Sequence, residues 1–93
     1  MGRRFEWDER KAASNLEKHG VSFFEATTVF YDPLSVLKPD PDHSLLEHRL
    51  LVLGTSCQGR ILVISFVMRG SQTRVISARR ATRQEKRRHE QGC

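Results

Sequence analysis

The sequence predicts one α+β domain in which two N-terminal helices and a basic C-terminal helix pack against an antiparallel meander sheet. Three observations support this. The chain has 93 residues, which is too few for two separate cores. Helical signals are confined to residues 9–30 and 81–91, and strand-like segments joined by short turns lie between them. With a short first strand, the order is β-α-α-β-β-β-β-α, and residues 1–93 form a single domain with its core at about 5–90.

The first elements are a short strand and a helix with clear ends. Residues 5–7 alternate apolar and polar side chains, which indicates a strand. Asp8 is a favourable N-cap, and Gly20 supplies the left-handed residue that commonly follows a helix. We therefore expect the first helix at about residues 9–19.

A second helix follows a corner at residues 20–21. Ser22 and Glu25 have the spacing of a capping box, in which each side chain bonds the other residue's backbone N–H. Apolar residues then recur at helical spacing up to Phe30. Asp32 precedes Pro33, and the residue before a proline disfavours helical geometry, so the helix ends there.

The periodicity then changes to that of strands. We expect strands at residues 34–38, 48–55, 60–68 and 74–78, separated by a proline-rich loop at 39–43 and turns at 57–59 and 70–72. Residues 60–68 are apolar on both faces, which predicts a central strand covered on two sides. In the last strand, simple alternation places Arg74 and Ala78 on one face and Arg79 on the other.

The last helix is predicted at residues 81–91. Thr82 and Glu85 form a second capping-box pattern, and Glu85, Arg88 and His89 share one helical face with Thr82. A carboxylate, a guanidinium and an imidazole on one face suit acid–base catalysis with phosphate binding. An ordinary Glu85–His89 helix pair, with Glu85 acting as a cap, explains the same spacing, so both interpretations stay open.

The positive charge is concentrated at the C-terminal end. The chain has a formal net charge of +5, but residues 1–68 carry −1 and residues 69–93 carry +6. Seven of the eight basic residues in that end are arginines, whose planar guanidinium binds phosphate in a bidentate manner. This distribution favours an anion-binding role over a merely solvated helix.

Other classes of protein are disfavoured. Cys57 and Cys93 cannot build a disulfide framework, no apolar run approaches the ~20 residues of a membrane span, and the N-terminus lacks a signal-peptide core. We therefore expect a cytoplasmic protein with no membrane partner. The four histidines are scattered and no CxxC spacing occurs, so no metal site and no cofactor are expected.

Several stretches together are similar to the BrnT toxins of BrnT/BrnA type II toxin–antitoxin modules. The resemblance covers about residues 5–90 and is strongest in Lys18-His-Gly-Val-Ser-Phe23 and Ile76-Ser-Ala-Arg-Arg-Ala81. Further matching residues are Phe5-Glu-Trp-Asp8, Lys11, Asn15, Glu25-Ala26, Asp32-Pro33, Gly54-Thr-Ser56, Gly59-Arg60, Arg74 and Glu85. The family commonly has a tyrosine at the position of His89 and an arginine at that of Lys86.

The resemblance implies a RelE-like fold and a ribonuclease that inhibits translation. It also implies neutralisation by a BrnA-type antitoxin, with which the toxin represses its own operon by binding operator DNA as a complex. A homodimer or a toxin–antitoxin heterotetramer fits so small a core.

A ribonuclease that uses the ribose 2′-hydroxyl needs a base, an acid and cations, but no metal. Glu85 or His19 is the expected base, and His19 or His89 the expected acid. The position of His19 also has a simpler explanation, because a cation in the last turn of a helix is stabilised by the helix dipole. The expected catalytic residues are His19, Arg74, Arg79, Arg80, Glu85 and His89; the expected RNA-binding residues are Lys18, Arg49, Arg60, Arg83 and Arg88. The alternative is a non-catalytic module that binds nucleic acid or a protein through the basic C-terminal segment.

Overall fold

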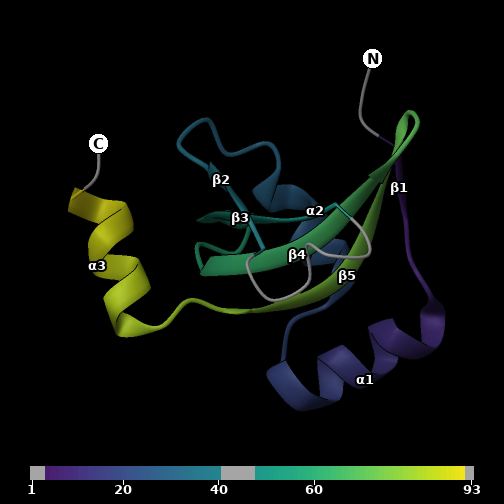
Figure 1. The fold of residues 1–93 in the computed structure, drawn as a ribbon. Helices are drawn as coiled ribbons and strands as arrows, with labels where there is room; N and C mark the ends of the chain where they lie inside the picture. The colour runs from purple at the N-terminus through teal and green to yellow at the C-terminus, as the bar shows by residue number, and fades with distance from the viewer. Residues whose placement is uncertain (1–3, 41–47, 92–93) are drawn as a thin grey trace.

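The fold is that of an α+β protein with three helices and one five-stranded sheet (Figure 1). The computed structural model describes residues 4–40 and 48–91. The elements are β1 (Arg4–Glu6), α1 (Glu9–His19), α2 (Phe23–Val29), β2 (Val36–Pro39), β3 (Arg49–Thr55), β4 (Ile61–Arg69), β5 (Gln72–Arg80) and α3 (Arg83–Gln91). This confirms the predicted class and the order β-α-α-β-β-β-β-α.

The sheet is mixed, so the prediction of an antiparallel meander is wrong for one strand. Strands β2 to β5 form antiparallel pairs in sequence, but β1 pairs parallel to β5 and completes the order β1-β5-β4-β3-β2. Alternation of apolar side chains reports which face a residue takes and carries no information on the direction of a neighbouring strand. Phe5 fixes β1 in place because its ring stacks on Phe30, which in turn packs on Phe66.

Both N-terminal helices begin as predicted and α1 also ends as predicted, whereas α2 ends at Val29, before the predicted stop at residues 32–33. The Asp8 carboxylate accepts a hydrogen bond from the Arg10 backbone N–H, and Gly20 follows α1 in the left-handed conformation. The Ser22 hydroxyl accepts a bond from the Glu25 N–H at the start of α2. These caps set the corner that lays both helices on the same face of the sheet.

The main core lies between α1, α2 and that face of the sheet. Val21, Phe23, Ala26 and Val29 pack against alternate residues of the strands, among them Leu62, Ile64, Phe66 and Val75. Val63, whose side chain takes the opposite face of β4, joins a smaller cluster with Leu53 and Ala81. The central strand is therefore covered on two sides, as predicted, by the helix pair on one face and by a smaller apolar cluster on the other.

A bulge in β5 overturns the predicted facing of its arginines. Ser65 pairs with Ser77 and Phe66 with Val75, so Ile76 is an extra residue in β5. Arg74 and Arg79 therefore lie opposite Val67 and Val63, on one face of the sheet, and not on opposite faces.

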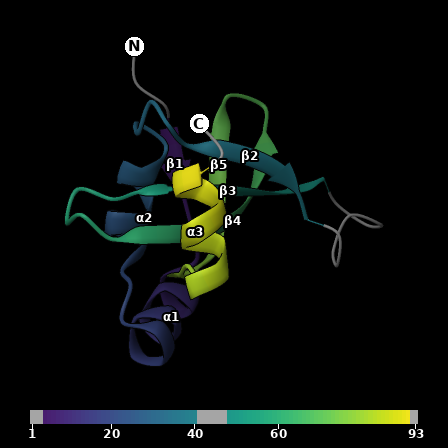
Figure 2. The same cartoon turned by 90° about the vertical axis from the view of Figure 1, so that its left-hand side faces the viewer.

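Helix α3 stands apart from the other two helices (Figures 1 and 2). It follows β5 beyond one end of the strands and lies near the face that α1 and α2 leave uncovered. Among the described residues no helix is long and apolar enough to cross a membrane.

Candidate functional site

The start of α3 is fastened to the end of β5 by one ion pair. Arg79 Nη1 donates to Glu85 Oε1 at 2.8 Å and Nη2 donates to Oε2 at 3.0 Å, which is the bidentate geometry that orients a guanidinium best. Glu85 also accepts a bond from the Thr82 N–H at 2.8 Å, and the Thr82 hydroxyl accepts one from the Glu85 N–H at 3.1 Å. The predicted capping box is confirmed, and its carboxylate also holds Arg79.

These contacts fix the charge of Glu85. Its hydrogen bonds to Arg79, more than any other contact, lower the pKa of Glu85 from 4.5 to about 2. A carboxylate of such low pKa accepts a proton poorly near neutrality. The geometry therefore favours a structural role for Glu85, as the cap of α3 and the partner of Arg79, over the role of base.

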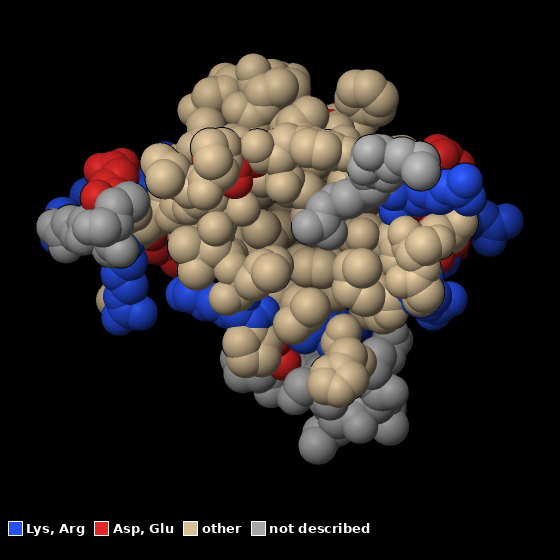
Figure 3. All heavy atoms as spheres, turned by 90° about the horizontal axis from the view of Figure 1, so that it is seen from above, with Lys and Arg blue, Asp and Glu red and all other residues tan. Residues whose placement is uncertain are grey.

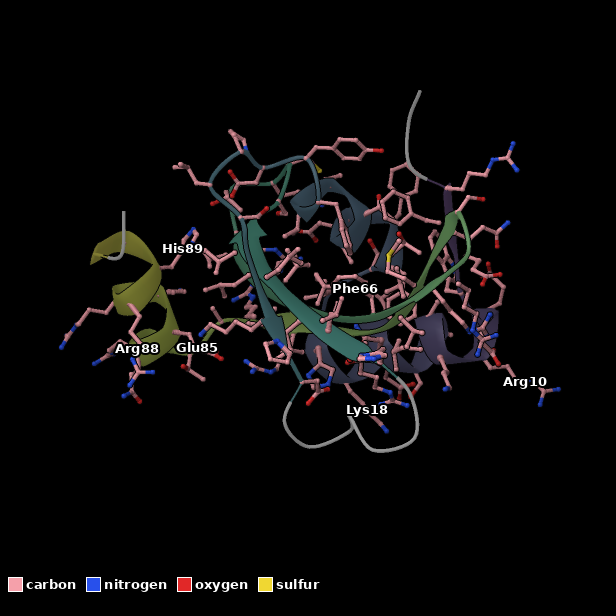
Figure 4. The ribbon with its side chains drawn as sticks, turned by 45° about the horizontal axis from the view of Figure 1, so that its top comes forward. Arg10, Lys18, Phe66, Glu85, Arg88 and His89 are labelled. Carbon is pink, nitrogen blue, oxygen red and sulfur yellow. The ribbon has the colours of Figure 1, made fainter. Side chains whose placement is uncertain are left out.

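A groove of about 410 Å³ separates α3 from the sheet. Its floor is apolar and its wall on the α3 side is polar. The lining residues are Leu34, Val36, Lys38, Leu51, Leu53, Val63, Gln84, Glu85, Arg88 and His89. Figure 4 shows Glu85 and His89 on the side of α3 that faces the strands. The imidazole of His89, half-buried, thus shares the groove with the carboxylate that holds Arg79.

More cations lie on the same sheet face. Arg74 and Arg49 are both register partners of Val67, from its two neighbouring strands. Arg74 lies 3.8 Å from Glu6, and its side chain keeps 27 % of its surface exposed. Together with Arg79, they place three guanidinium groups along one side of the sheet, which is an arrangement suited to a polyanion.

Asp32 stands near the groove. Its carboxylate accepts bonds from the backbone N–H groups of Thr55 and Leu34, which lower its pKa; the charge of His89 lowers it further. Gly54 allows this close packing, because a Cβ there would lie only 2.9 Å from Ser35 Cβ. A negative charge thus sits within electrostatic range of the His89 imidazole.

Arg60 is engaged elsewhere. Its Nε donates to Glu25 Oε2 at 3.0 Å, its Nη2 contacts Oε1, and the same nitrogen donates to the Gly20 carbonyl at 3.1 Å. Glu25 is only 2 % exposed and also accepts from the Ser56 hydroxyl. The hydrogen bond from Arg60 is the main cause that lowers the pKa of Glu25. This arrangement ties β4 to α2 and to the α1–α2 corner.

The remaining predicted site residues lie in three places. Arg80 is the register partner of Leu62, so it takes the face of the main core and lies near Glu25. Lys18 and His19 are exposed in the last turn of α1, and Figure 4 shows Lys18 far from Glu85, Arg88 and His89. Arg83 is exposed on α3. The structure therefore brings Arg49, Arg74, Arg79, Glu85, Arg88 and His89 to one face and leaves His19, Lys18, Arg60 and Arg80 away from it.

Sequence reasoning missed several residues of the groove. Lys38, Gln84 and Asp32 line it or lie beside it. Gln84 precedes Glu85 on the predicted helix, so the helical pattern could have predicted that it lies on the groove side. The position of Lys38 could not be predicted in this way, because it depends on the register between β2 and β3. Within residues 4–40 and 48–91, no three His, Cys, Asp or Glu side chains converge as metal ligands would.

Comparisons with known proteins place this geometry in context. A family model described as the ribonuclease toxin BrnT of type II toxin–antitoxin systems matches residues 7–85. The crystal structure of the Brucella abortus ribonuclease toxin BrnT is similar to this chain: the two are 26% identical and superpose with a TM-score of 0.68, over 88% of this chain and 100% of that one. No curated protein matches the sequence.

Proposed function

Because this chain belongs to the BrnT family of ribonuclease toxins of type II toxin–antitoxin systems, we propose that it cleaves RNA without a metal ion on the α3 face of its sheet. The observation that carries the proposal is the Arg79–Glu85 pair beside the groove that His89 enters. Transfer of a phosphoryl group within RNA can use a guanidinium to stabilise charge on the phosphate and an imidazole to move the proton.

Arg79 is the residue proposed to stabilise the scissile phosphate. Glu85 occupies one edge of its guanidinium in a fixed orientation, and Nη1 also donates to the Arg80 carbonyl at 3.3 Å, which leaves Nε and the second N–H of Nη2 to donate to phosphate oxygens. The register partners of Arg79 and Arg74 on β4 are four positions apart, so the two arginines are separated by roughly 13 Å along the strand. We assign Arg74 and Arg49 to neighbouring phosphates of the same RNA strand, and Arg88 to the rim of the groove. Glu85 is then a positioning residue.

His89 is the residue proposed to move the proton. Its neutral imidazole accepts the proton of the 2′-hydroxyl as that oxygen forms a bond to phosphorus. The bond from phosphorus to the 5′-oxygen breaks, and the imidazolium gives the proton to this leaving oxygen. The products are a 2′,3′-cyclic phosphate and a 5′-hydroxyl. His19 and Arg80 have no part in this scheme, because His19 lies at the end of α1 and the Arg80 side chain takes the opposite face of the sheet from Arg79.

Metal independence follows from the choice of nucleophile. The attacking oxygen belongs to the RNA itself, so no water has to be activated by a metal ion. The charge that develops on the phosphate is met by the arginines of the sheet face.

The cellular role is proposed from family membership. Cleavage of RNA in the cytoplasm would inhibit translation, and a BrnA-type antitoxin would neutralise the enzyme. The complex of the two would repress their shared operon through contacts with operator DNA, with the antitoxin supplying most of them. Assembly as a homodimer or as a heterotetramer remains part of this proposal.

The test is cleavage of a defined RNA in EDTA by purified chain, with the product ends identified by mass. We expect 2′,3′-cyclic phosphate ends, and we expect an RNA with 2′-deoxyribose at the cleaved position to resist. Cleavage that leaves a 3′-hydroxyl, or that stops in EDTA, would contradict the mechanism. Tight, strongly salt-dependent binding without any cleavage would favour the non-catalytic alternative.

A further inference from the structure

Helix α3 covers an apolar surface without having an apolar side chain of its own. All its residues, from Arg83 to Gln91, are polar or charged. The groove beneath it is floored by the aliphatic side chains of Leu34, Val36, Leu51, Leu53 and Val63. A helix that packs on a sheet normally buries a stripe of apolar residues. Helix α3 is instead fastened by the Arg79–Glu85 pair and its cap, which leaves the floor beneath it unfilled.

The apolar surface at the β2 side of this groove is open to solvent. Leu34 is 61% exposed and Val36 43%, and both line the groove. Leu37, 59% exposed, is the register partner of the core residue Val52 and takes the other face of β2. Seen from above, most side chains in the centre of the molecule are neither Lys, Arg, Asp nor Glu, and charged side chains of both signs lie toward the edges (Figure 3). Contiguous apolar surface of this kind marks sites where proteins dock.

Strand β2 adds an unpaired edge to the same surface. It is the last strand of the sheet and pairs only with β3 among the described strands. All four of its residues are exposed. An edge of this type can accept a further strand from another chain, since its outer backbone groups are free of ladder partners.

The charges around the groove select the occupant. Lys38 and Arg88 line it, and the exposed Arg83, Lys86 and Arg87 continue the positive charge along α3. A partner segment that combines aliphatic side chains for the floor with carboxylates for this rim would match both properties. A basic segment would be repelled.

We propose that the groove between α3 and the sheet, with the free edge of β2, is where the antitoxin docks an acidic segment that carries aliphatic residues. Those aliphatic residues fill the floor beneath α3, and the carboxylates face Lys38 and Arg88. Because Glu85 and His89 line the same groove, the docked segment covers the proposed site and excludes RNA. The inference rests on the proposed function for the identity of the partner.

The experiment uses this chain co-expressed with the antitoxin encoded beside it, and compares two matched variants. Leu34→Gln removes an exposed leucine from the groove, while Leu16→Gln removes one of similar exposure, 51%, from α1. We expect Leu34→Gln to weaken antitoxin binding about 30-fold or more, as loss of an interface anchor does, and Leu16→Gln to leave it unchanged. Lys38→Glu should weaken binding, whereas Lys11→Glu on α1 should not.

RNA cleavage by each free variant is measured in parallel, which separates this inference from the proposed function. Leu16→Gln, on α1 and outside the groove, should cleave RNA as the wild-type chain does, and Leu34→Gln should lose antitoxin affinity whatever its cleavage rate. Equal antitoxin affinity for the wild-type chain and Leu34→Gln would overturn the docking site, as would the absence of any complex with the wild-type chain. Unchanged antitoxin binding with weakened RNA binding would show that the groove is an RNA subsite instead.

Discussion

Asn15 is the residue that joins α1 to the sheet most directly. Its Nδ2 donates to the carbonyls of Val21 and Ala78, at 2.9 and 2.8 Å, and its Oδ1 accepts from the Ala78 N–H at 3.1 Å. The side chain is buried, so water cannot replace these bonds. Asn15 thereby provides hydrogen-bond partners for the N–H and C=O groups of Ala78. Ala78 lies close to the β5 bulge, which places Arg74 and Arg79 on the same face.

We predict that Asn15→Ala destabilises the fold by about 3 kcal/mol, since buried backbone groups left without partners cost about 1–3 kcal/mol each. The free energy of unfolding from urea titrations measures this. Lys11→Ala, at an exposed position of the same helix, serves as the control and should change it by less than about 0.5 kcal/mol. A loss for Asn15→Ala no larger than the control's would contradict the role given to this residue.

Local sequence patterns predicted the residues whose partners are near in the chain. The caps at Asp8, Ser22 and Thr82 rest on spacings of two or three residues and are confirmed. The function of Glu85 is not predictable in this way, because its spacing from Thr82 and His89 fits three roles: a helix cap, a partner of His89 and a catalytic base. The end of β5 brings Arg79 to Glu85, and this tertiary contact shows that the carboxylate is an ion-pair partner.

At the scale of elements, the attachment of α3 should depend on the charge of Glu85. We predict that Glu85→Gln lowers the free energy of unfolding at pH 7 by about 1 kcal/mol, the upper range for a partly exposed pair. Glutamine keeps the capping-box pattern, so the loss reports the charge.

The pH dependence follows from the lowered pKa. Since the pKa of Glu85 falls from 4.5 to about 2 on folding, its contribution is fully present above about pH 4.5 and is lost as the pH falls through about 2. The difference between wild type and Glu85→Gln should persist at pH 7 and vanish near pH 2. A difference that does not change with pH would show that the charge of Glu85 does not stabilise the fold.

The bulge in β5 explains why element-level prediction failed where it mattered for the site. Uninterrupted alternation from Arg74 to Arg79 predicts opposite faces for the two side chains. The extra residue between Val75 and Ser77 inverts that parity. Bulges depend on how the partner strand is registered, and a single strand's sequence does not contain that information.

For the whole molecule, the sequence predicted the uneven charge but not its division between faces. Residues 69–93 carry +6, and the structure distributes them among the groove face, the core face at Arg80 and the exposed side of α3. The pairing of β5 with β4 determines which face each arginine takes, and the sequence of β5 alone does not contain it. The parallel pairing of β1 with β5 was unpredictable for the same reason.

RNA binding should show this division in its salt dependence. Each phosphate contact on single-stranded RNA contributes about 0.7 to the slope of log K against log salt. We predict that Arg88→Ala reduces the slope by about 0.7, while Arg10→Ala, far across the molecule in Figure 4, leaves it unchanged. Fluorescence anisotropy over a salt series measures both, and equal slopes for the two variants would contradict the placement of RNA beside α3.

The most direct test of the whole account compares two adjacent arginines. Arg79 faces the groove side of the sheet and Arg80 the opposite side, so their methionine variants remove a cation from opposite faces, and Arg79→Met also removes the pair with Glu85. Single-turnover cleavage of one RNA, with folding checked by circular dichroism, should fall about 100-fold or more for Arg79→Met and stay within a few-fold of wild type for Arg80→Met. Equal losses, or a larger loss for Arg80→Met, would contradict the assignment of catalysis to the α3 face.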